Sequence, residues 1–157
     1  MSNFDDILNQ AKKNGQVPAP KEIVVQPPEN KENNEKKEWV EKQKKKREQL
    51  FAMIEAACPT IVSSIEKMSE FLKVQSNFEK YSLNNNILIF AQKPDATKVK
   101  DFNGWKDEGG SVKKGSKGFF IMEPSAYKKD GEDRVAFNPK TVFDISDVAD
   151  VDPVQQV

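Results

Sequence analysis

Histidine is absent from this sequence of 157 residues, and cysteine occurs only once, at Cys58. Without histidine the chain can build neither a histidine-liganded zinc site nor the histidine acid–base pairs on which many hydrolases depend. A single cysteine excludes an internal disulfide bond and indicates a reducing compartment. Cys58 lies in the apolar run IEAACP, so we expect a small buried side chain rather than a nucleophile. The chain is therefore expected not to be an enzyme, to hold no metal ion and to need no cofactor.

Long hydrophobic runs are also missing, because no stretch approaches the ~20 apolar residues that cross a bilayer. The first residues, MSNFDDILNQAKKN, lack the apolar centre of a secretory signal, so a cytoplasmic location without membrane contact is expected. The length suits one domain. Because 36% of the residues are hydrophobic and 32% are charged, the core should be small, with only ~100 residues in the folded domain.

The formal net charge is zero, but the charges are unevenly distributed. Residues 80–140 carry 12 lysines and arginines against 8 aspartates and glutamates, whereas residues 141–157 carry four aspartates and no basic residue. An acidic tail can shield a basic surface, or it can serve as a solvated linker. The linker is the interpretation that we prefer.

Composition divides the chain into three parts. Residues 1–34 are rich in proline and polar side chains and are expected to form a flexible arm. The apolar residues 23–25 of this arm could dock as an edge strand or bind a partner. Residues 35–147 are expected to form one α+β domain, with helices first and a small antiparallel β-sheet after them. Residues 148–157 are expected to form an acidic tail or linker.

The first half of that domain has the composition and spacing of helices. Glu35–Ala57 contains no glycine or proline and is rich in lysine, glutamate and glutamine, which favour helix. Pro59 should interrupt the backbone. Thr60 can then cap a second helix, with apolar residues at helical spacing, that ends at Phe71 or Val74.

Two shorter helices are expected next. Ser82 can cap a helix that runs to about Gln92, and Pro94 should stop it. Thr97 can cap another helix, which carries Trp105 on or near its inner face and ends at a glycine pair.

The last part of the domain has the pattern of strands. Residues 111–114 and 119–122 are joined by a glycine-containing turn and predict a β-hairpin. A second pair of strands is expected at residues 134–137 and 141–145, separated by an Asn-Pro pair. The polar loop at residues 128–133 predicts a turn.

Amide and aromatic side chains around the third helix suit contact with nucleic acid. Asn85 and Gln92 share one side of the predicted helix, and amides can pair with base edges. The alternative is that they make buried amide hydrogen bonds. Tyr81 and Trp105 could stack on bases, although a tryptophan on an amphipathic helix can equally belong to the core.

Lysines add a candidate site for phosphate. Lys113, Lys114 and Lys117 flank Gly115, and three ammonium groups so close together repel one another unless an anion or solvent screens them. A phosphate backbone would supply that anion, and the alternative is an exposed turn kept soluble by its charge. The basic run at residues 42–47 could add phosphate contacts or form a solvated helical face. The candidate nucleic-acid-binding residues are thus Tyr81, Asn85, Gln92, Trp105, Lys113, Lys114 and Lys117.

The same region carries four motifs in a fixed order. They are Tyr-Ser-x-x-Asn-x-x-Leu-Ile from Tyr81, Gln-x-Pro-x-Ala-Thr from Gln92, Trp-x-x-x-Gly from Trp105 and Val-Lys-Lys-Gly-x-Lys-Gly from Val112. This series resembles the N-terminal domain of ArdC/LtrC-type antirestriction proteins. The resemblance covers roughly residues 36–146.

That resemblance implies a single-stranded DNA-binding module of plasmids, conjugative elements and phages, usually followed by a zinc metallopeptidase-like domain. The sequence departs from the family in having no His-Glu-x-x-His motif, so the peptidase domain is expected to be absent and could be a separate partner. It also lacks the Pro-Trp pairs common early in relatives. We expect non-catalytic binding of single-stranded DNA with little sequence preference. The alternative is a protein-interaction module that docks a DNA-processing or restriction partner.

Overall fold

The computed structural model describes residues 33–151, and the predicted arm therefore lies almost wholly outside the described residues. Three helices come first: α2 (Asn33–Ile61), α3 (Ile65–Asn77) and α4 (Leu83–Gln92). The short helix α5 (Phe102–Asp107) and antiparallel strands follow. The prediction of an α+β domain with helices before sheet is confirmed.

The helix α2 is longer than the sequence predicts. It continues through Pro59 to Ile61 because proline disturbs only the last turn, where little helix remains to be broken. The next helix is capped by Ser64 and not by Thr60, since the Ser64 side chain accepts a hydrogen bond of 3.1 Å from the Lys67 amide. Cys58 is exposed, so the prediction that it is buried is wrong.

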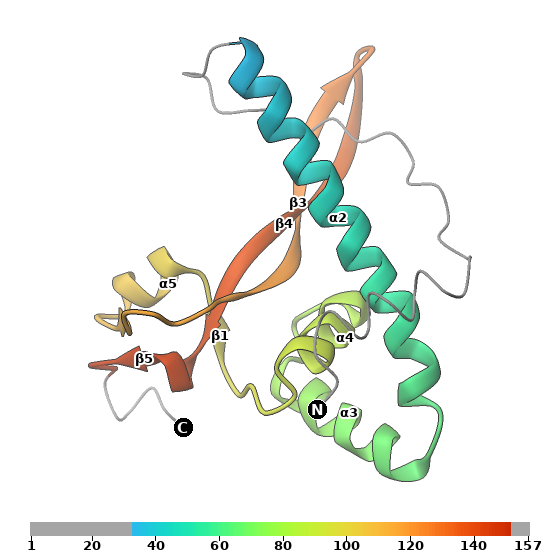
Figure 1. Ribbon diagram of the computed structural model, residues 1–157, viewed down its shortest axis with the longest axis vertical. Helices are drawn as coiled ribbons and strands as arrows, with labels where there is room; N and C mark the ends of the chain where they lie inside the picture. Colours follow the sequence, from blue (N-terminus) through green and yellow to red (C-terminus); the bar gives the residue numbers. More distant parts are fainter. Residues whose placement is uncertain (1–32, 152–157) are drawn as a thin grey trace.

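The main core lies where α2, α3 and α4 meet the sheet. The helix α4 is buried on most sides, and Leu88 and Ile89 have no exposed surface at all. Ser82 caps this helix as predicted, accepting from the Asn85 amide at 3.2 Å. Phe71 of α3 meets Phe90 of α4 edge to face at 5.7 Å between ring centres. Figure 1 shows α3, α4 and the second half of α2 gathered at one end of the molecule.

The strands β3 (Phe119–Lys129) and β4 (Glu132–Asp144) form one long antiparallel hairpin. Its turn at Asp130-Gly131, with φ of 55° and 80°, confirms the turn predicted at 128–133. The prediction of two strands separated at the Asn-Pro pair is wrong, because β4 is continuous there. Pro139 lies opposite Met122, whose backbone hydrogen bonds point away from β4, so proline costs no ladder bond at this position.

The smaller sheet joins distant parts of the chain. It consists of β2 (Ser111–Val112) paired with β5 (Val148–Ala149). The strand β1 (Val99–Lys100) belongs to the larger sheet, where it pairs with the end of β4. The predicted hairpin between residues 111–114 and 119–122 is therefore wrong, because β3 pairs with β4 along its whole length.

The fold also extends beyond the predicted boundary at residue 147. Val148 and Val151 are buried against Trp105 in a second, smaller core. The helix that carries Trp105 is capped by Asp101, whose carboxylate accepts from the Gly104 amide at 2.8 Å, and not by Thr97 as predicted.

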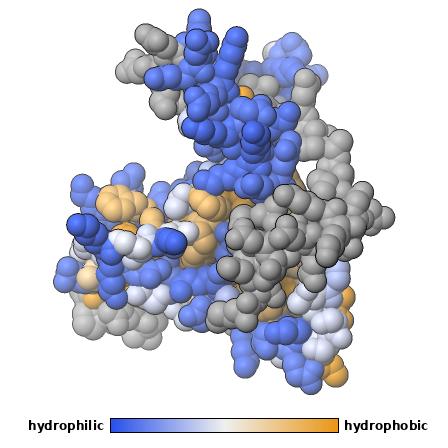
Figure 2. Space-filling model, in the orientation of Figure 1, coloured by the Kyte–Doolittle hydropathy of each residue, from blue (hydrophilic) through white to orange (hydrophobic). Residues whose placement is uncertain are grey.

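The hairpin and the first half of α2 extend away from the main core. Figure 1 shows the hairpin running beside α2 toward its first turns. Figure 2 shows that hydrophilic side chains cover this half of α2, as expected for its lysine- and glutamate-rich sequence. No helix within residues 33–151 is long and apolar enough to span a membrane.

Candidate nucleic-acid interface

The two amides singled out in the sequence lie against the edge of β3. The side chain of Asn85 donates to the Met122 carbonyl at 2.8 Å and accepts from the Met122 amide at 2.9 Å. Gln92 repeats the pattern at Phe120, donating at 2.7 Å and accepting at 3.0 Å. Side-chain amides thus take the place of a neighbouring strand and satisfy the edge. Their polar groups face the protein backbone rather than a base.

Trp105 is fully buried, with no exposed surface. Its indole N–H donates to the Phe143 carbonyl at 2.8 Å, and its ring packs on Val148 and Val151. A base could stack on this ring only if the second core opened. The structure therefore gives Trp105 the core position that the sequence left as an alternative.

The three lysines lie exposed in one turn, as the sequence predicts. This turn connects β2 to β3, and Gly115 has a φ of 85° that favours glycine. Lys113 is fixed at both ends, because its backbone amide donates to the Asp147 carbonyl at 2.8 Å and its ammonium donates to the Ser146 carbonyl at 3.1 Å. The ammonium groups of the turn are accessible to an anion in solution.

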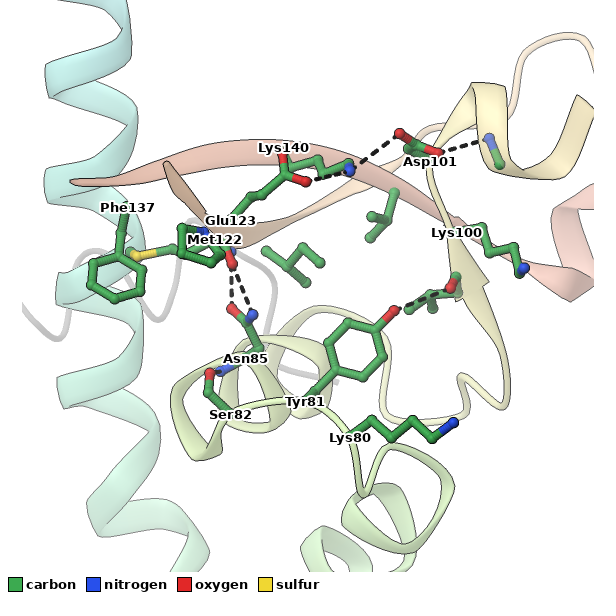
Figure 3. A pocket seen from close by; sticks show the side chains of 15 residues that line it. Lys80, Tyr81, Ser82, Asn85, Lys100, Asp101, Met122, Glu123, Phe137 and Lys140 are labelled. Atoms are coloured by element: carbon green, nitrogen blue, oxygen red, sulfur yellow. Dashed lines mark hydrogen bonds and ion pairs between the residues drawn. The ribbon is translucent and has the colours of Figure 1, made fainter. Parts of the chain in front are cut away.

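A cleft of about 640 Å³ opens between the α3–α4 turn, the β1–α5 corner and the base of the hairpin. Figure 3 shows that its lining comes from all three places. Of the residues predicted from sequence, Tyr81 and Asn85 line it. Its other aromatic and charged lining residues are Lys80, Lys100, Asp101, Glu123, Phe137 and Lys140.

Tyr81 is half-buried and held in place from two sides. Its hydroxyl donates to the Val99 carbonyl at 3.3 Å, and its ring meets Phe78 edge to face at 5.6 Å. The buried Asn86 amide donates to the carbonyls of Phe78, Tyr81 and Ser82, each at 3.2 Å, and so fixes the turn itself. Burial raises the pKa of Tyr81, although nearby lysines oppose the shift. The phenol is therefore neutral at pH 7 and offers a fixed ring face.

Charges inside the cleft are largely compensated. Lys140 lies 2.8 Å from Glu123 and 3.2 Å from Asp101, and its hydrogen bond to Glu123 raises the pKa of Lys140. Lys100 pairs with Glu108, and this hydrogen bond lowers the pKa of Glu108. Lys80 is exposed, and no carboxylate among the described residues forms an ion pair with it.

The cleft has an apolar end and a basic end. Figure 3 shows Phe137 and Met122 on one side, Lys80 and Lys100 on the other, and Tyr81 between them. Phe137 is 48% exposed, so about half of its side chain is open to a ligand.

Sequence reasoning missed Phe137 and the cleft lysines. Alternation along a strand shows that Phe137 and Val135 share a face, but it does not show whether that face is covered. The lysines come from separate elements that only the tertiary fold brings together. No local motif could have indicated the set.

A metal site finds no support in the described residues. Within residues 33–151 no group of three or more histidine, cysteine, aspartate or glutamate side chains is arranged to hold an ion.

Comparison with known families identifies the domain. The model of the N-terminal domain of anti-restriction factor ArdC matches residues 41–149. No curated protein and no solved structure matches the chain. The matched segment includes most of α2, the cleft, the lysine turn and the hairpin. The resemblance of the motif series is thereby confirmed, and the chain belongs to the family of the N-terminal domain of the anti-restriction factor ArdC.

Proposed function

We propose that this domain binds single-stranded DNA without catalysis, as part of an antirestriction protein of a mobile element. The observation that carries the proposal is the exposed turn of Lys113, Lys114 and Lys117 in a domain of this family. Clustered ammonium groups can neutralise successive phosphates and release counterions. Contacts between lysines and phosphates do not depend on which base is attached, so little sequence preference is expected.

The structure narrows the residues that this proposal uses. Tyr81 remains a candidate for contact with a base, because part of its ring is accessible in the cleft. Asn85 and Gln92 are left out because the protein backbone occupies their polar groups, and Trp105 is left out because its ring is fully buried. The lysines of α2 at residues 42–46 remain candidates for further phosphate contacts.

The test is fluorescence anisotropy of a labelled oligonucleotide, single-stranded or duplex, at two salt concentrations. Tighter and salt-sensitive binding to the single strand is expected. Replacing Lys113, Lys114 and Lys117 by alanine together should weaken binding and lower the slope of log affinity against log salt by about 2. The matched control replaces three exposed lysines on other elements: Lys73, Lys106 and Lys128. Equal affinities for both folded triple variants would remove the lysine turn from the proposal.

A second candidate function is docking of a DNA-processing or restriction protein. It is favoured by the exposed apolar face of the hairpin, where Pro124 pairs with Phe137 and Ala126 pairs with Val135. Val135 is 59% exposed, and contiguous apolar surface of this kind is typical of interaction sites. Salt-insensitive binding to such a protein, together with no retention of DNA, would favour this function over the first.

A further inference from the structure

We infer that the cleft beside Tyr81 receives one nucleotide of the bound strand, with its base against Phe137 and its phosphate at Lys80. This inference rests on the proposed binding of single-stranded DNA and assigns a specific place to one unit of the strand. It differs from the lysine turn, which lies on the loop between β2 and β3 and does not line the cleft.

The shape and polarity of the cleft suit a nucleotide. Its volume of about 640 Å³ lies within the ~300–1,000 Å³ of pockets that enclose small organic ligands. A nucleotide has a flat, largely apolar base at one end and an anionic phosphate at the other. The cleft has the matching order, with Phe137 at one end, the Tyr81 ring between and lysines at the far end (Figure 3).

Phe137 is held at the apolar end by its backbone. The guanidinium of Arg47, itself buried, donates to the Phe137 carbonyl at 3.2 Å. The preceding residue, Ala136, is buried, so the strand is fixed on one side while the Phe137 ring remains exposed on the other. A half-exposed ring on a fixed strand has few rotatable bonds to order on stacking, and stacking accepts any base.

Tyr81 lines one side of the cleft and is already fixed in its position. Its hydroxyl already has a partner in Val99, and its ring is fixed by the edge contact with Phe78. This arrangement leaves the ring face, rather than the hydroxyl, to contact a ligand. A base or sugar lying between Tyr81 and Phe137 would cover apolar surface on both sides.

Electrostatics place the phosphate at Lys80. A phosphate near Lys140 would approach Glu123 and Asp101, which already share that ammonium group, and like charges repel at such distances. Lys100 is engaged by Glu108. Lys80 is exposed and has no carboxylate partner among the described residues. Pairing Lys80 with a phosphate therefore costs less free energy of desolvation than pairing Lys100 or Lys140.

The test compares two exposed apolar residues of the same strand face. Phe137→Ala should lower the affinity of the full chain for a labelled oligothymidylate by about 5- to 150-fold, as expected for the loss of one base–aromatic contact. Val135→Ala, on the same face but outside the cleft, should change affinity less than twofold. Phe137→Tyr, which keeps an aromatic ring, should retain most of the affinity.

The basic end is tested with a second matched pair. Lys80→Ala should lower affinity and reduce the slope of log affinity against log salt by roughly 0.7, the value for one phosphate contact on a single strand. Lys73→Ala, an exposed lysine on α3, should leave that slope unchanged. Thermal unfolding of each variant shows whether it has retained the fold.

The results separate this inference from the proposed function. If the wild-type chain binds the oligonucleotide but Phe137→Ala and Lys80→Ala bind as tightly as their controls, the cleft is not the nucleotide site, although the proposed function stands. If the wild-type chain binds no single-stranded DNA at low salt, both proposals are wrong. Loss of affinity in Phe137→Ala with rescue by Phe137→Tyr supports the cleft directly.

Discussion

At the scale of single residues, the amides of α4 show how a side chain can complete a sheet. Asn85 and Gln92 both donate to and accept from the edge of β3, at alternate residues of the strand. An edge residue whose outward amide and carbonyl are both satisfied needs no water and no further strand. Asparagine and glutamine suit the edge of a base and the edge of a strand for the same reason. Each of these edges presents a hydrogen-bond donor beside an acceptor, which a side-chain amide can match.

Removing the Asn85 amide should therefore destabilise the fold. In Asn85→Ala the buried amide and carbonyl of Met122 lose their partners, and we expect the free energy of unfolding to fall by about 1–3 kcal/mol. Urea denaturation measures this change. Asn84→Ala is the matched control, since Asn84 is exposed on the same helix and the change in helix propensity is the same.

The same pair of variants also tests the base-edge hypothesis for Asn85. If Asn85→Ala proves as stable as Asn84→Ala but binds single-stranded DNA less tightly, the amide contacts DNA and the structural role is secondary. If Asn85→Ala loses stability and keeps its affinity when folded, the amide serves the sheet.

At the scale of secondary-structure elements, the contact between α2 and the hairpin depends on an unusual buried arginine. Arg47 is 1% exposed, and no carboxylate among the described residues forms an ion pair with it. One nitrogen donates to the Phe137 carbonyl, but the Nε atom has no partner, nor has the Oδ1 atom of Asn138. Burial lowers the pKa of Arg47, with Glu48 opposing the shift. The arrangement orients the hairpin at a cost in desolvation.

Two replacements of Arg47 separate the contribution of its packing to stability from that of its charge. Arg47→Met keeps most of the volume and removes the buried cation, so the free energy of unfolding should stay within about 1 kcal/mol of the wild-type value. Arg47→Ala leaves a cavity and should cost about 2–4 kcal/mol. Chemical denaturation of both variants checks this. A loss above about 3 kcal/mol in Arg47→Met would show that the hydrogen bond to Phe137, rather than the packing, stabilises the interface.

Elements set by local signals could be predicted from the sequence, and those set by distant pairing could not. The helix from Ser82 to Gln92 follows from a cap and a periodic apolar pattern, and both signals lie within the helix. The partner of Ser111-Val112 lies at Val148-Ala149, and nothing in either pair of residues indicates the other. The apolar run that begins at Phe119 lies much closer in the sequence. Pairing residues 111–114 with that run was therefore the natural prediction, although it is wrong.

The candidate site follows the same division. The turn of Lys113, Lys114 and Lys117 is a feature of local sequence, and it is exposed as expected. The shared side of Asn85 and Gln92 was also correct, but helical spacing could not reveal that β3 lies against it. The cleft depends on elements that meet only in the folded chain.

At the scale of the whole molecule, the domain has two cores of unequal size. The larger core lies between the three long helices and the hairpin, whereas the smaller one is built around Trp105, Val148 and Val151. The smaller core is closed by β2 and β5, which are only two residues long each. The lysine turn extends from this smaller part of the molecule.

The difference in size between the two cores predicts that the smaller one opens before the whole domain unfolds. A small apolar cluster held by short strands buries little surface, so its amides should exchange through local openings at a lower free energy than the amides of α4. Native-state hydrogen exchange, measured over increasing urea, resolves the two groups. The amide of Lys113, which donates to the Asp147 carbonyl at the end of β2, and that of Leu88 in α4 are suitable probes of each part. A single common free energy for both would mean that the domain unfolds as one unit.

DNA should then slow hydrogen exchange in a pattern that shows where it binds. A ligand stabilises the parts of a protein that must be folded to bind it, by an amount that rises with its concentration relative to Kd. If the lysine turn contacts the strand, saturating oligonucleotide should slow exchange in β2 and β5 as well as in α4, because local opening of the smaller core and unfolding of the whole domain both break that contact. Duplex DNA at the same concentration is the control, since weaker binding must protect less. Slower exchange in α4 without slower exchange in β2 and β5 would place the contact away from the lysine turn, on surfaces that stay folded when the smaller core opens.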